Sequence, residues 1–576
     1  MKTLILLLIY FFVKLYLLMD KKLPYTLGEL PAFWYEDSLF IIFFAIGEVL
    51  ASKKTVKTLY FVALCYLALN VPVWRVLSTP FTPAIFFATG GPLKDSILSY
   101  LTVKNLIPGS LIIAFGIGLP RIFKDHRAWV YLSASFAILV AILGSFRVKK
   151  IDTLGLDRNP FLLLAYSFVE RVGFDSRLNT KTPRDVNPLV TYPNEALAGF
   201  RGKFLNRSIL HVILESTGAQ YLKPYGATED PMPYLTKLAS RGIVFENAYS
   251  VYPESIKGLF SVLCSTFPAF DSKAEEYSGV GPPSIAEVVR QRGYSTALFH
   301  SGRFDYLGMN AIVQKRGFDH LVDASSMGDS HSSSFGMSDE RVVVRKMLQW
   351  VDSLKGEGPF YLLYLPIAGH HPYLSPEKGP FSGEKFIHYY YNSIHHMDGA
   401  LKLLVEELKK RTFGQDPVVI IHADHGEAFH QHPGNSAHSL FIYDENILVP
   451  FIIVPPDQET AIRMSPSVSL IDVSPTLLDL VGIPSPSTYQ GVSLLRSYRS
   501  LNFFLTDYSL GFLGLREGQW KYIYEVNKRR SSLFDLSMDP NETTDRAKEF
   551  SQKVATYEGI VLDWASQHKK KLFHFQ

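Results

Sequence analysis

The amino-terminal quarter of the chain is so rich in apolar residues that it strongly indicates membrane helices. Its first stretch, TLILLLIYFFVKLYLLM (Thr3–Met19), is long enough for a membrane-spanning helix. No small-residue cleavage site follows it, which favours an anchor over a removed signal peptide. We therefore predict a transmembrane region over residues 1–150 with about five helices. The predicted spans are Thr3–Met19, Asp37–Ala51, Thr58–Trp74, Leu106–Pro120 and Trp129–Phe146.

Two of these stretches, Asp37–Ala51 and Leu106–Pro120, are short for a membrane span. They could be tilted, re-entrant or interfacial, so four spans are the alternative to five. The loops Ser52–Lys57 and Arg121–Arg127 are basic, which places both in the cytoplasm by the positive-inside rule. Five spans then leave everything after the last span on the outer side of the cell membrane. The basic run Arg147–Lys150 at that exit opposes this orientation.

Length, charge and cysteine content limit the possible domain organisation, partners and disulfide bonds of the chain. At 576 residues the chain is long enough for two or more structural units. A formal net charge of +4 gives no sign of nucleic acid as a partner, and we predict none. The two cysteines, Cys65 and Cys264, are too few for a disulfide framework, so we expect two free, buried thiols.

The remainder of the chain has the composition of a soluble protein. Residues 151–205 have little periodicity and many Pro, Asn and Arg residues, which is typical of a linker. Over residues 206–576, apolar runs such as SILHVILE (Ser208–Glu215) alternate with amphipathic runs such as MPYLTKLASRG (Met232–Gly242). This alternation predicts an α/β fold, with a mostly parallel sheet sandwiched by helices.

Polar side chains stand at the ends of four of the predicted strands. They are Glu215, His300, the pair His370–His371, and the pair Asp424–His425. Ligands bind beyond the carboxyl ends of the strands in sheets of this kind, so these residues mark a candidate site. Glu215, Asp424 and His425 would offer oxygen and nitrogen ligands to a divalent cation.

A candidate nucleophile lies in the stretch NAYSVYPESIKGLFSVLCS (Asn247–Ser265). The apolar run Ile256–Cys264 predicts a helix, so Ser255 stands at the amino terminus of that helix. The positive end of the helix and a nearby cation would both favour the alkoxide form of this serine. The alternative is a helix N-cap, for which serine is a preferred residue. Lys257 could support the nucleophile, although we expect it to be a surface lysine.

Four motifs follow one another in the order of a known enzyme family. HVILESTGAQYLKPYG and IIHADHGEAF resemble the two metal-ligand segments of the sulfatase family, within the alkaline phosphatase superfamily. TKLASRGIVFENAYS resembles the approach to the nucleophile, and RGYSTALFHSG resembles a strand that carries substrate-binding groups. The resemblance extends from about Ser208 to Asp545 and implies a sulfatase-like catalytic domain over residues 206–576.

The resemblance departs from true sulfatases at two places. True sulfatases begin with paired aspartates, where this chain has Glu215-Ser216. Their nucleophile is oxidised to formylglycine in a C/S-x-P-S-R setting, whereas the stretch Ser255–Leu259 lacks the Pro and the Arg. The membrane-spanning start resembles the lipoteichoic acid synthases and phosphoethanolamine transferases, which use an unmodified threonine. Ser255 differs from that threonine but keeps the hydroxyl group.

The resemblance implies a role for each candidate residue. One divalent ion, Mn or Zn in preference to Ca or Mg, would be held by Glu215, Ser255, Asp424 and His425. Ser255 would form a covalent intermediate. The substrate would be bound by His300, Arg303, His370 and His438.

Three functions remain open from the sequence. The first is a membrane-anchored enzyme that transfers or hydrolyses a phospho-head group, of phosphoglycerol or phosphoethanolamine type, on a lipid or glycan outside the cell (cytoplasmic or inner) membrane. The second is a sulfuric ester hydrolase, which requires oxidation of Ser255. The third is an inactive relative that binds lipid or a partner protein. The intact set of ligand-type residues argues against the third.

Overall fold

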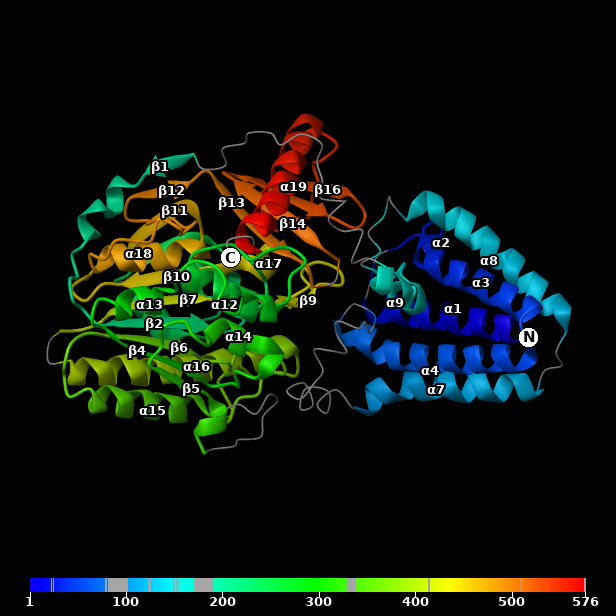
Figure 1. Cartoon of the computed structure of the whole chain (residues 1–576), viewed down its shortest axis with the longest axis horizontal. Coiled ribbons are helices and arrows are strands. Elements are labelled where there is room, and N and C mark those ends of the chain that lie inside the picture. Colours follow the sequence, from blue (N-terminus) through cyan, green and yellow to red (C-terminus); the bar gives the residue numbers. More distant parts are fainter. Residues whose placement is uncertain are drawn as a thin grey trace. The chain divides into compact units, whose positions relative to one another are not determined.

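The computed structural model describes the chain apart from residues 22, 24, 78–79, 81–101, 123–125, 149–150, 152, 154, 170–189, 329–337, 413–414, 509 and 574–576. It divides into two compact units. The first contains the helices before residue 177, and the second contains nearly all of the remaining chain (Figure 1). Residues 123–125 of the predicted cytoplasmic loop and residues 170–189 of the predicted linker lie outside the described residues.

The first unit consists of helices, and many of their outward-facing side chains are apolar. In the described residues, four helices are long and apolar enough to cross a membrane: α1 (Lys2–Asp20), α4 (Lys53–Leu77), α7 (Val103–Ile122) and α8 (Arg127–Arg147). Helix α3 (Tyr35–Leu50) has 16 residues and packs against α1 and α8, and the short α2 (Leu30–Phe33) precedes it. All five predicted spans therefore fall on helices, while the number that cross the membrane remains a prediction.

A charged pair is buried among these helices. Lys14 on α1 places its Nζ 3.4 Å from Asp37 Oδ2 on α3, and the same Nζ donates to the carbonyl oxygen of Arg158 at 2.7 Å. Asn159 Nδ2 donates to Asp37 Oδ1 at 2.7 Å. Charged groups among membrane helices are costly unless they are paired. This pair fastens the segment that leads into α9 (Pro160–Val169) to helices α1 and α3.

The two cysteines differ in exposure. Cys264, at the end of α12 (Ser255–Cys264), is buried as predicted, but Cys65 on α4 is exposed. The prediction that both thiols are buried is therefore wrong for Cys65. An apolar run in a membrane helix has a side that faces lipid as well as a side that faces other helices, and local composition does not distinguish them.

The second unit is built on an eight-stranded sheet with the order β11-β3-β10-β7-β2-β6-β4-β5. Neighbouring strands are parallel except at β10, which is antiparallel to both β3 and β7. Strands β2, β6 and β7 are buried at every residue, as their continuous apolar runs predict. The strands are β2 (Ile209–Leu214), β3 (Ile243–Tyr249), β4 (Ser295–His300), β5 (His320–Val322), β6 (Phe360–Leu365), β7 (Val418–Ala423), β10 (Leu448–Val454) and β11 (Ile462–Ser469).

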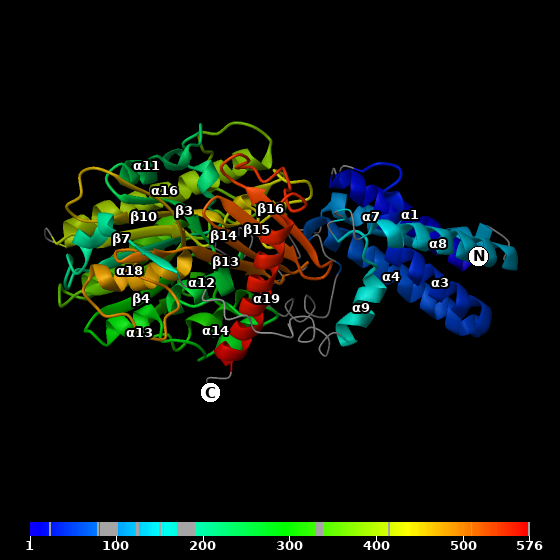
Figure 2. The same ribbon diagram turned by 90° about the horizontal axis from the view of Figure 1, so that it is seen from above.

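Helices cover both faces of this sheet (Figure 2). One face carries α11 (Pro233–Ala239), α15 (Glu340–Ser353) and α16 (Phe386–Arg411). The other carries α12, α13 (Ile285–Arg290), α14 (Met309–Val313) and α18 (Val473–Leu480). The predicted α/β fold with a sheet sandwiched by helices is therefore confirmed, and its sheet is mixed because of β10.

Smaller elements complete the second unit. A four-stranded antiparallel sheet contains β13 (Leu501–Thr506), β14 (Phe512–Glu517), β15 (Trp520–Glu525) and β16 (Arg530–Asp535), and helix α19 (Ser551–Phe573) packs on it. Strand β1 (Thr191–Pro193), which lies in the predicted linker, pairs with β12 (Ser497–Arg499). A short hairpin of β8 (Ala428–Phe429) and β9 (Ser436–Ala437) follows β7.

Candidate active site

Strand register brings the predicted site residues to one edge of the central sheet. Leu214 at the end of β2 pairs with Ala423 at the end of β7, so Glu215 and Asp424 leave the sheet side by side. His300 pairs with Leu365 at the ends of β4 and β6. Because β7, β2, β6 and β4 are neighbours in that order, all four predicted strand ends meet at this edge. We call it the carboxyl edge.

Two carboxylates and one imidazole form the centre of the site. His425 Nε2 lies 3.4 Å from Asp424 Oδ2 and 3.6 Å from Glu215 Oε1. The backbone N–H groups of Ser216 and His425 both donate to Asp424 Oδ1, at 3.0 and 2.8 Å, which fixes that carboxylate. His425 Nδ1 lies 2.9 Å from the carbonyl oxygen of Gly426. A hydrogen bond there leaves the Nε2 lone pair directed at the two carboxylates.

The electrostatics of this cluster favour a cation. Burial, together with the charge of Asp424, raises the pKa of Glu215 well above its usual value. Two buried carboxylates next to each other repel when both are ionised, and a divalent cation between them removes that cost. One ligand atom from each of Glu215, Asp424 and His425 lies within 4.8 Å of the others. These three residues therefore fit a divalent cation, and their donor atoms suit zinc or manganese.

Ser255 is the first residue of α12, and it is not the cap of that helix. The N-cap is Glu254, whose carboxylate accepts from the backbone N–H groups of Ile256 and Lys257 at 3.1 and 3.3 Å. The hydroxyl of Ser255 is therefore free for the site, where it donates to Glu215 Oε2 at 2.9 Å and lies 3.3 Å from His425 Nε2. The N-cap alternative for Ser255 is thus wrong.

Histidines extend the site from His425. The His438 ring stacks on the His425 ring with a centroid separation of 4.1 Å, and the His370 ring lies 5.5 Å from His438. Burial lowers the pKa of both His370 and His438 to about 4. The His371 ring packs on Tyr373 at 5.2 Å, and the charge of Glu427 acts on the pKa of both His370 and His371. The structure therefore brings both histidines near the cluster, and the His370 ring is the one in contact with His438.

The two remaining predicted substrate-binding residues, His300 and Arg303, differ in their exposure to solvent. His300 is buried, and its Nδ1 lies 3.0 Å from the carbonyl oxygen of Leu365. Burial lowers its pKa, which favours the neutral imidazole. Arg303 lies three residues farther along, where its side chain is exposed. Its part in substrate binding remains a prediction.

Sequence reasoning missed a buried glutamate and a tyrosine. Glu427 accepts from Tyr373 Oη, and its other oxygen lies 2.7 Å from His438 Nδ1. The hairpin of β8 and β9 causes this contact, because it folds His438 back beside Glu427. The available signal was the acidic residue in the D-H-G-E turn, two positions after His425. Tyr373 follows the His370–His371 pair and had no signal of its own.

Lys257 is buried, so its prediction as a surface residue is wrong. Its Nζ contacts both carboxylate oxygens of Asp507 at 2.8 Å, and Tyr252 Oη donates to the same carboxylate at 2.6 Å. Asp507 directly follows strand β13. The second sheet thus holds the helix that begins with Ser255, and this long-range contact could not be read from the helix alone.

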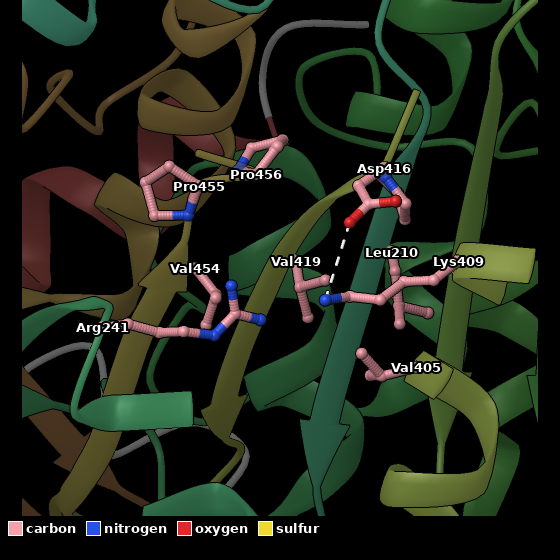
Figure 3. A pocket seen from close by; sticks show the side chains of 10 residues that line it. Leu210, Arg241, Val405, Lys409, Asp416, Val419, Val454, Pro455 and Pro456 are labelled. Atoms are coloured by element: carbon pink, nitrogen blue, oxygen red, sulfur yellow. Dashed lines mark ion pairs between the residues drawn. The ribbon is translucent and has the colours of Figure 1, made fainter. Parts of the chain in front are cut away.

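A small pocket lies at the opposite edge of the central sheet (Figure 3). It is lined by Leu210 and Val419, near the amino ends of β2 and β7, and by Arg241, Lys409 and Asp416. Its volume is about 10 Å³, which is room for roughly one water molecule. Lys409 Nζ pairs with Asp416 Oδ2 at 3.6 Å, and both side chains are partly exposed. This pocket is too small for an ester substrate.

Comparison with known proteins identifies the fold and the type of domain. Residues 207–483 match the family model described as Sulfatase. The chain contains a sulfatase-family domain. Arylsulfatase K of Rattus norvegicus is 24% identical over 405 residues, which cover 56% of this chain and 71% of that protein. Lipoteichoic acid synthase 2 of Bacillus subtilis (strain 168) is 22% identical over 505 residues, which cover 78% of this chain and 75% of that protein.

Solved structures agree with this assignment of the fold. An alkaline phosphatase superfamily protein from Vibrio parahaemolyticus superposes with a TM-score of 0.54 at 20% identity, covering 69% of this chain and 95% of that chain. A lipoteichoic acid synthase from Listeria monocytogenes superposes with a TM-score of 0.53 at 19% identity, covering 65% and 94%. The sulfatase domain thus has the fold of enzymes that act on sulfate or phosphate esters, and its site has residues that can hold a metal ion.

Proposed function

We propose that this protein is a membrane-anchored, metal-dependent enzyme that transfers or hydrolyses a phospho-head group through a covalent intermediate on Ser255. The observation that carries the proposal is the position of the Ser255 hydroxyl. It lies at the start of α12 and contacts both Glu215 (2.9 Å) and His425 (3.3 Å), which are two of the three candidate cation ligands. A serine in this place is a suitably activated nucleophile.

The reaction would proceed in two steps at phosphorus. In the first, Ser255 Oγ gives up its proton and forms a bond to phosphorus, the bond from phosphorus to the leaving oxygen breaks, and that oxygen takes up a proton to give the alcohol. In the second, a hydroxyl acceptor or water gives up a proton and attacks the phosphoserine, and Ser255 Oγ leaves and takes up a proton. A divalent ion, Mn or Zn, held by Glu215, Ser255, Asp424 and His425, would supply Lewis-acid stabilisation of negative charge. His300, Arg303, His370 and His438 would bind the phosphoryl oxygens or the head group.

The extent of the similarity supports the membrane-anchored branch. Residues 206–576 are 371 of the 576 residues, or about 64% of the chain. The match to lipoteichoic acid synthase 2 covers 78% of the chain, so it must extend into the part before residue 206. The match to arylsulfatase K covers 56% and does not require this. We therefore infer a phosphoglycerol- or phosphoethanolamine-type ester on a membrane lipid or glycan as substrate.

The apolar helices and the basic loops between them support a location for the reaction. The basic loops Ser52–Lys57 and Arg121–Arg127 support a cytoplasmic position for both. A multi-pass topology with five spans would then place the sulfatase domain on the outer side of the cell membrane. The proposal therefore assigns two partners, the ester substrate and the lipid bilayer.

A sulfuric ester hydrolase is the second candidate, and the similarity to arylsulfatase K favours it. It would require oxidation of Ser255 to formylglycine, although the surrounding Ser-Ile-Lys-Gly-Leu lacks the Pro and Arg of the sulfatase pattern. Mass spectrometry of the Ser255 peptide distinguishes the two candidates. Formylglycine lowers the mass of the peptide by two hydrogens, whereas a trapped phosphoryl group raises it.

The experiment that tests the proposal uses the purified full chain in detergent, with and without the Ser255→Ala substitution. Metal content is measured for both proteins, together with release of head group from a mixed lipid extract. We expect metal in both and product from the wild type alone. Metal without lipid turnover, combined with cleavage of a sulfate ester, would contradict the phosphate proposal and favour the sulfatase.

A further inference from the structure

A buried glutamate outside the metal cluster joins two segments of the carboxyl edge. Glu340 is the first residue of α15, and none of its surface is exposed to solvent. A carboxylate in this setting is costly unless several donors compensate it. The start of a 14-residue helix contributes a partial positive charge, and the remaining compensation comes from the ends of β4 and β6.

Four hydrogen bonds converge on the Glu340 carboxylate. Its Oε1 accepts from Ser301 Oγ at 2.8 Å and from the backbone N–H groups of Ile367 and Ala368 at 2.9 and 3.1 Å. Its Oε2 accepts from Tyr364 Oη. Ser301 Oγ also accepts from the Ile367 N–H at 2.8 Å, so the same hydroxyl bridges the two segments directly.

These donors flank the predicted substrate-binding histidines. Ser301 directly follows His300 at the end of β4, and Ala368 lies two residues before His370 beyond the end of β6. The sheet ladder between β4 and β6 ends at the pairing of His300 with Leu365. Backbone N–H groups past that point need other partners, and the Glu340 carboxylate supplies them.

We propose that Glu340 is a positioning residue that fixes His300 and His370 relative to each other for binding of phosphoryl oxygens. This inference rests on the proposed function, since it assumes that both histidines face the substrate. None of these four hydrogen bonds involves a residue of the metal cluster. They join Glu340 to residues at the ends of β4 and β6, whereas Glu215 and Asp424 follow β2 and β7. Loss of Glu340 should therefore weaken substrate binding while metal binding persists.

The test compares Glu340→Ala with Glu340→Gln in the full chain. Alanine removes an acceptor from all four donors, of which the Ile367 N–H keeps a second acceptor in Ser301 Oγ. Glutamine keeps an acceptor oxygen for Ser301, Ile367 and Ala368. Binding of inorganic phosphate to the metal-loaded protein is measured by calorimetry, which needs no turnover. We expect Glu340→Ala to weaken phosphate binding about 100-fold, with metal content unchanged, and Glu340→Gln to restore most of the loss.

A second measurement separates positioning from a general effect on folding. In a protein that carries both His300→Ala and His370→Ala, the further change Glu340→Ala should weaken phosphate binding by less than about threefold, because it acts through the two histidines. An equal loss in both backgrounds would overturn the proposal, and so would a loss of metal with Glu340→Ala. If Glu340→Ala does not fold, Ser301→Ala replaces it, and unchanged phosphate binding there would also overturn it.

The outcomes distinguish this inference from the proposed function. Phosphate binding that depends on Glu340, without release of any lipid head group, would keep the positioning role and remove the proposed lipid reaction. Head-group release that is unaffected by Glu340→Ala would keep the proposed lipid reaction and remove the positioning role.

Discussion

The two edges of the central sheet differ in how their charged groups are compensated. At the carboxyl edge, Glu215 and Asp424 are buried next to each other, and the charge of a third buried carboxylate, Glu427, also raises the pKa of Glu215. At the opposite edge, Lys409 and Asp416 form a partly exposed ion pair beside a pocket with room for one water molecule. The two edges lie at opposite ends of the same strands, β2 and β7.

The difference shows which charged groups indicate a function. A partly exposed ion pair is hydrated and contributes little to stability, so it needs no further explanation. Two buried carboxylates side by side are unfavourable in the protein alone, and they persist where a bound cation compensates them. The carboxyl edge is therefore the one at which chemistry is expected, and the following predictions test that contrast.

The largest effect is expected for Ser255→Ala. Removal of the attacking oxygen should lower the turnover of the lipid substrate by at least about 1,000-fold, with metal content close to that of the wild type. The measurement is head-group release, followed against metal content. Ser261→Ala is the matched control, because Ser261 lies on the same helix and donates only to the Lys257 carbonyl oxygen. Full turnover by Ser255→Ala would disprove the nucleophile assignment.

Asp424→Asn should remove the cation while leaving the fold intact. The substitution takes one negative charge from the cluster, so metal affinity should fall by more than about 100-fold. Metal titration followed by calorimetry measures this directly. Asp416→Asn, at the opposite edge, serves as the control and should leave metal affinity unchanged. Equal affinities for the wild type and Asp424→Asn would show that the metal binds elsewhere.

His438→Ala should reduce kcat/KM for the substrate by about 100-fold, because the ring would no longer contact the phosphoryl group. Metal content should stay near the wild-type value. His395→Ala is the control, since His395 lies on α16 and its Nδ1 faces the carbonyl oxygen of Pro231. Loss of metal in His438→Ala would instead make His438 a ligand, together with Glu427 and His425.

A buried carboxylate between the two edges should make stability depend on pH. Asp398 on α16 accepts from the backbone N–H groups of Tyr234 and Leu235, yet burial raises its pKa from 3.8 to about 7. Between about pH 4 and 7 the folded state therefore holds a proton on Asp398 that the unfolded state has lost. The contribution of Asp398 to stability is thus greatest below about pH 4 and falls as the pH rises to about 7.

The apparent melting temperature of the full chain, followed by intrinsic fluorescence, tests this dependence. The wild type should lose stability between these pH values by more than Asp398→Asn does. Parallel curves for the two proteins would show that Asp398 does not titrate in this range.

The smallest effect is expected for Lys409→Ala at the opposite edge. The pair with Asp416 is partly exposed, so its loss should change stability by less than about 0.5 kcal/mol and leave activity unchanged. Chemical denaturation and head-group release measure the two quantities. A clear fall in activity would mean that the two edges are coupled, and the contrast between them would then be lost.

Several parts of the site follow from local sequence patterns. Strand β4 lies within the motif RGYSTALFHSG, which was predicted to contain a strand, and the apolar runs of β2 and β7 end where Glu215 and Asp424 begin. A parallel arrangement of such strands requires their carboxyl ends to share an edge, so the meeting of these residues could be predicted. The pair His370–His371 was predicted from its strand end and the substrate-binding role of His370 from the family resemblance, whereas His438 was predicted from family resemblance alone.

Other parts depended on contacts between distant segments. The capping role of Glu254 frees Ser255, and the burial of Lys257 depends on Asp507, about 250 residues away. Likewise, Glu427 meets Tyr373 only because the segments after β6 and β7 approach each other. None of these contacts leaves a periodic pattern in the sequence.

The sequence by itself determined the apolar helices, the α/β class and the strands that end in ligand-type residues, because each depends on the period and composition of a short segment. Only the tertiary structure decided the antiparallel direction of β10, the exposure of Cys65, the partner of His438 and the four donors around Glu340. These depend on which segments become neighbours in space, and the energy of such contacts is shared between residues that the local pattern does not connect.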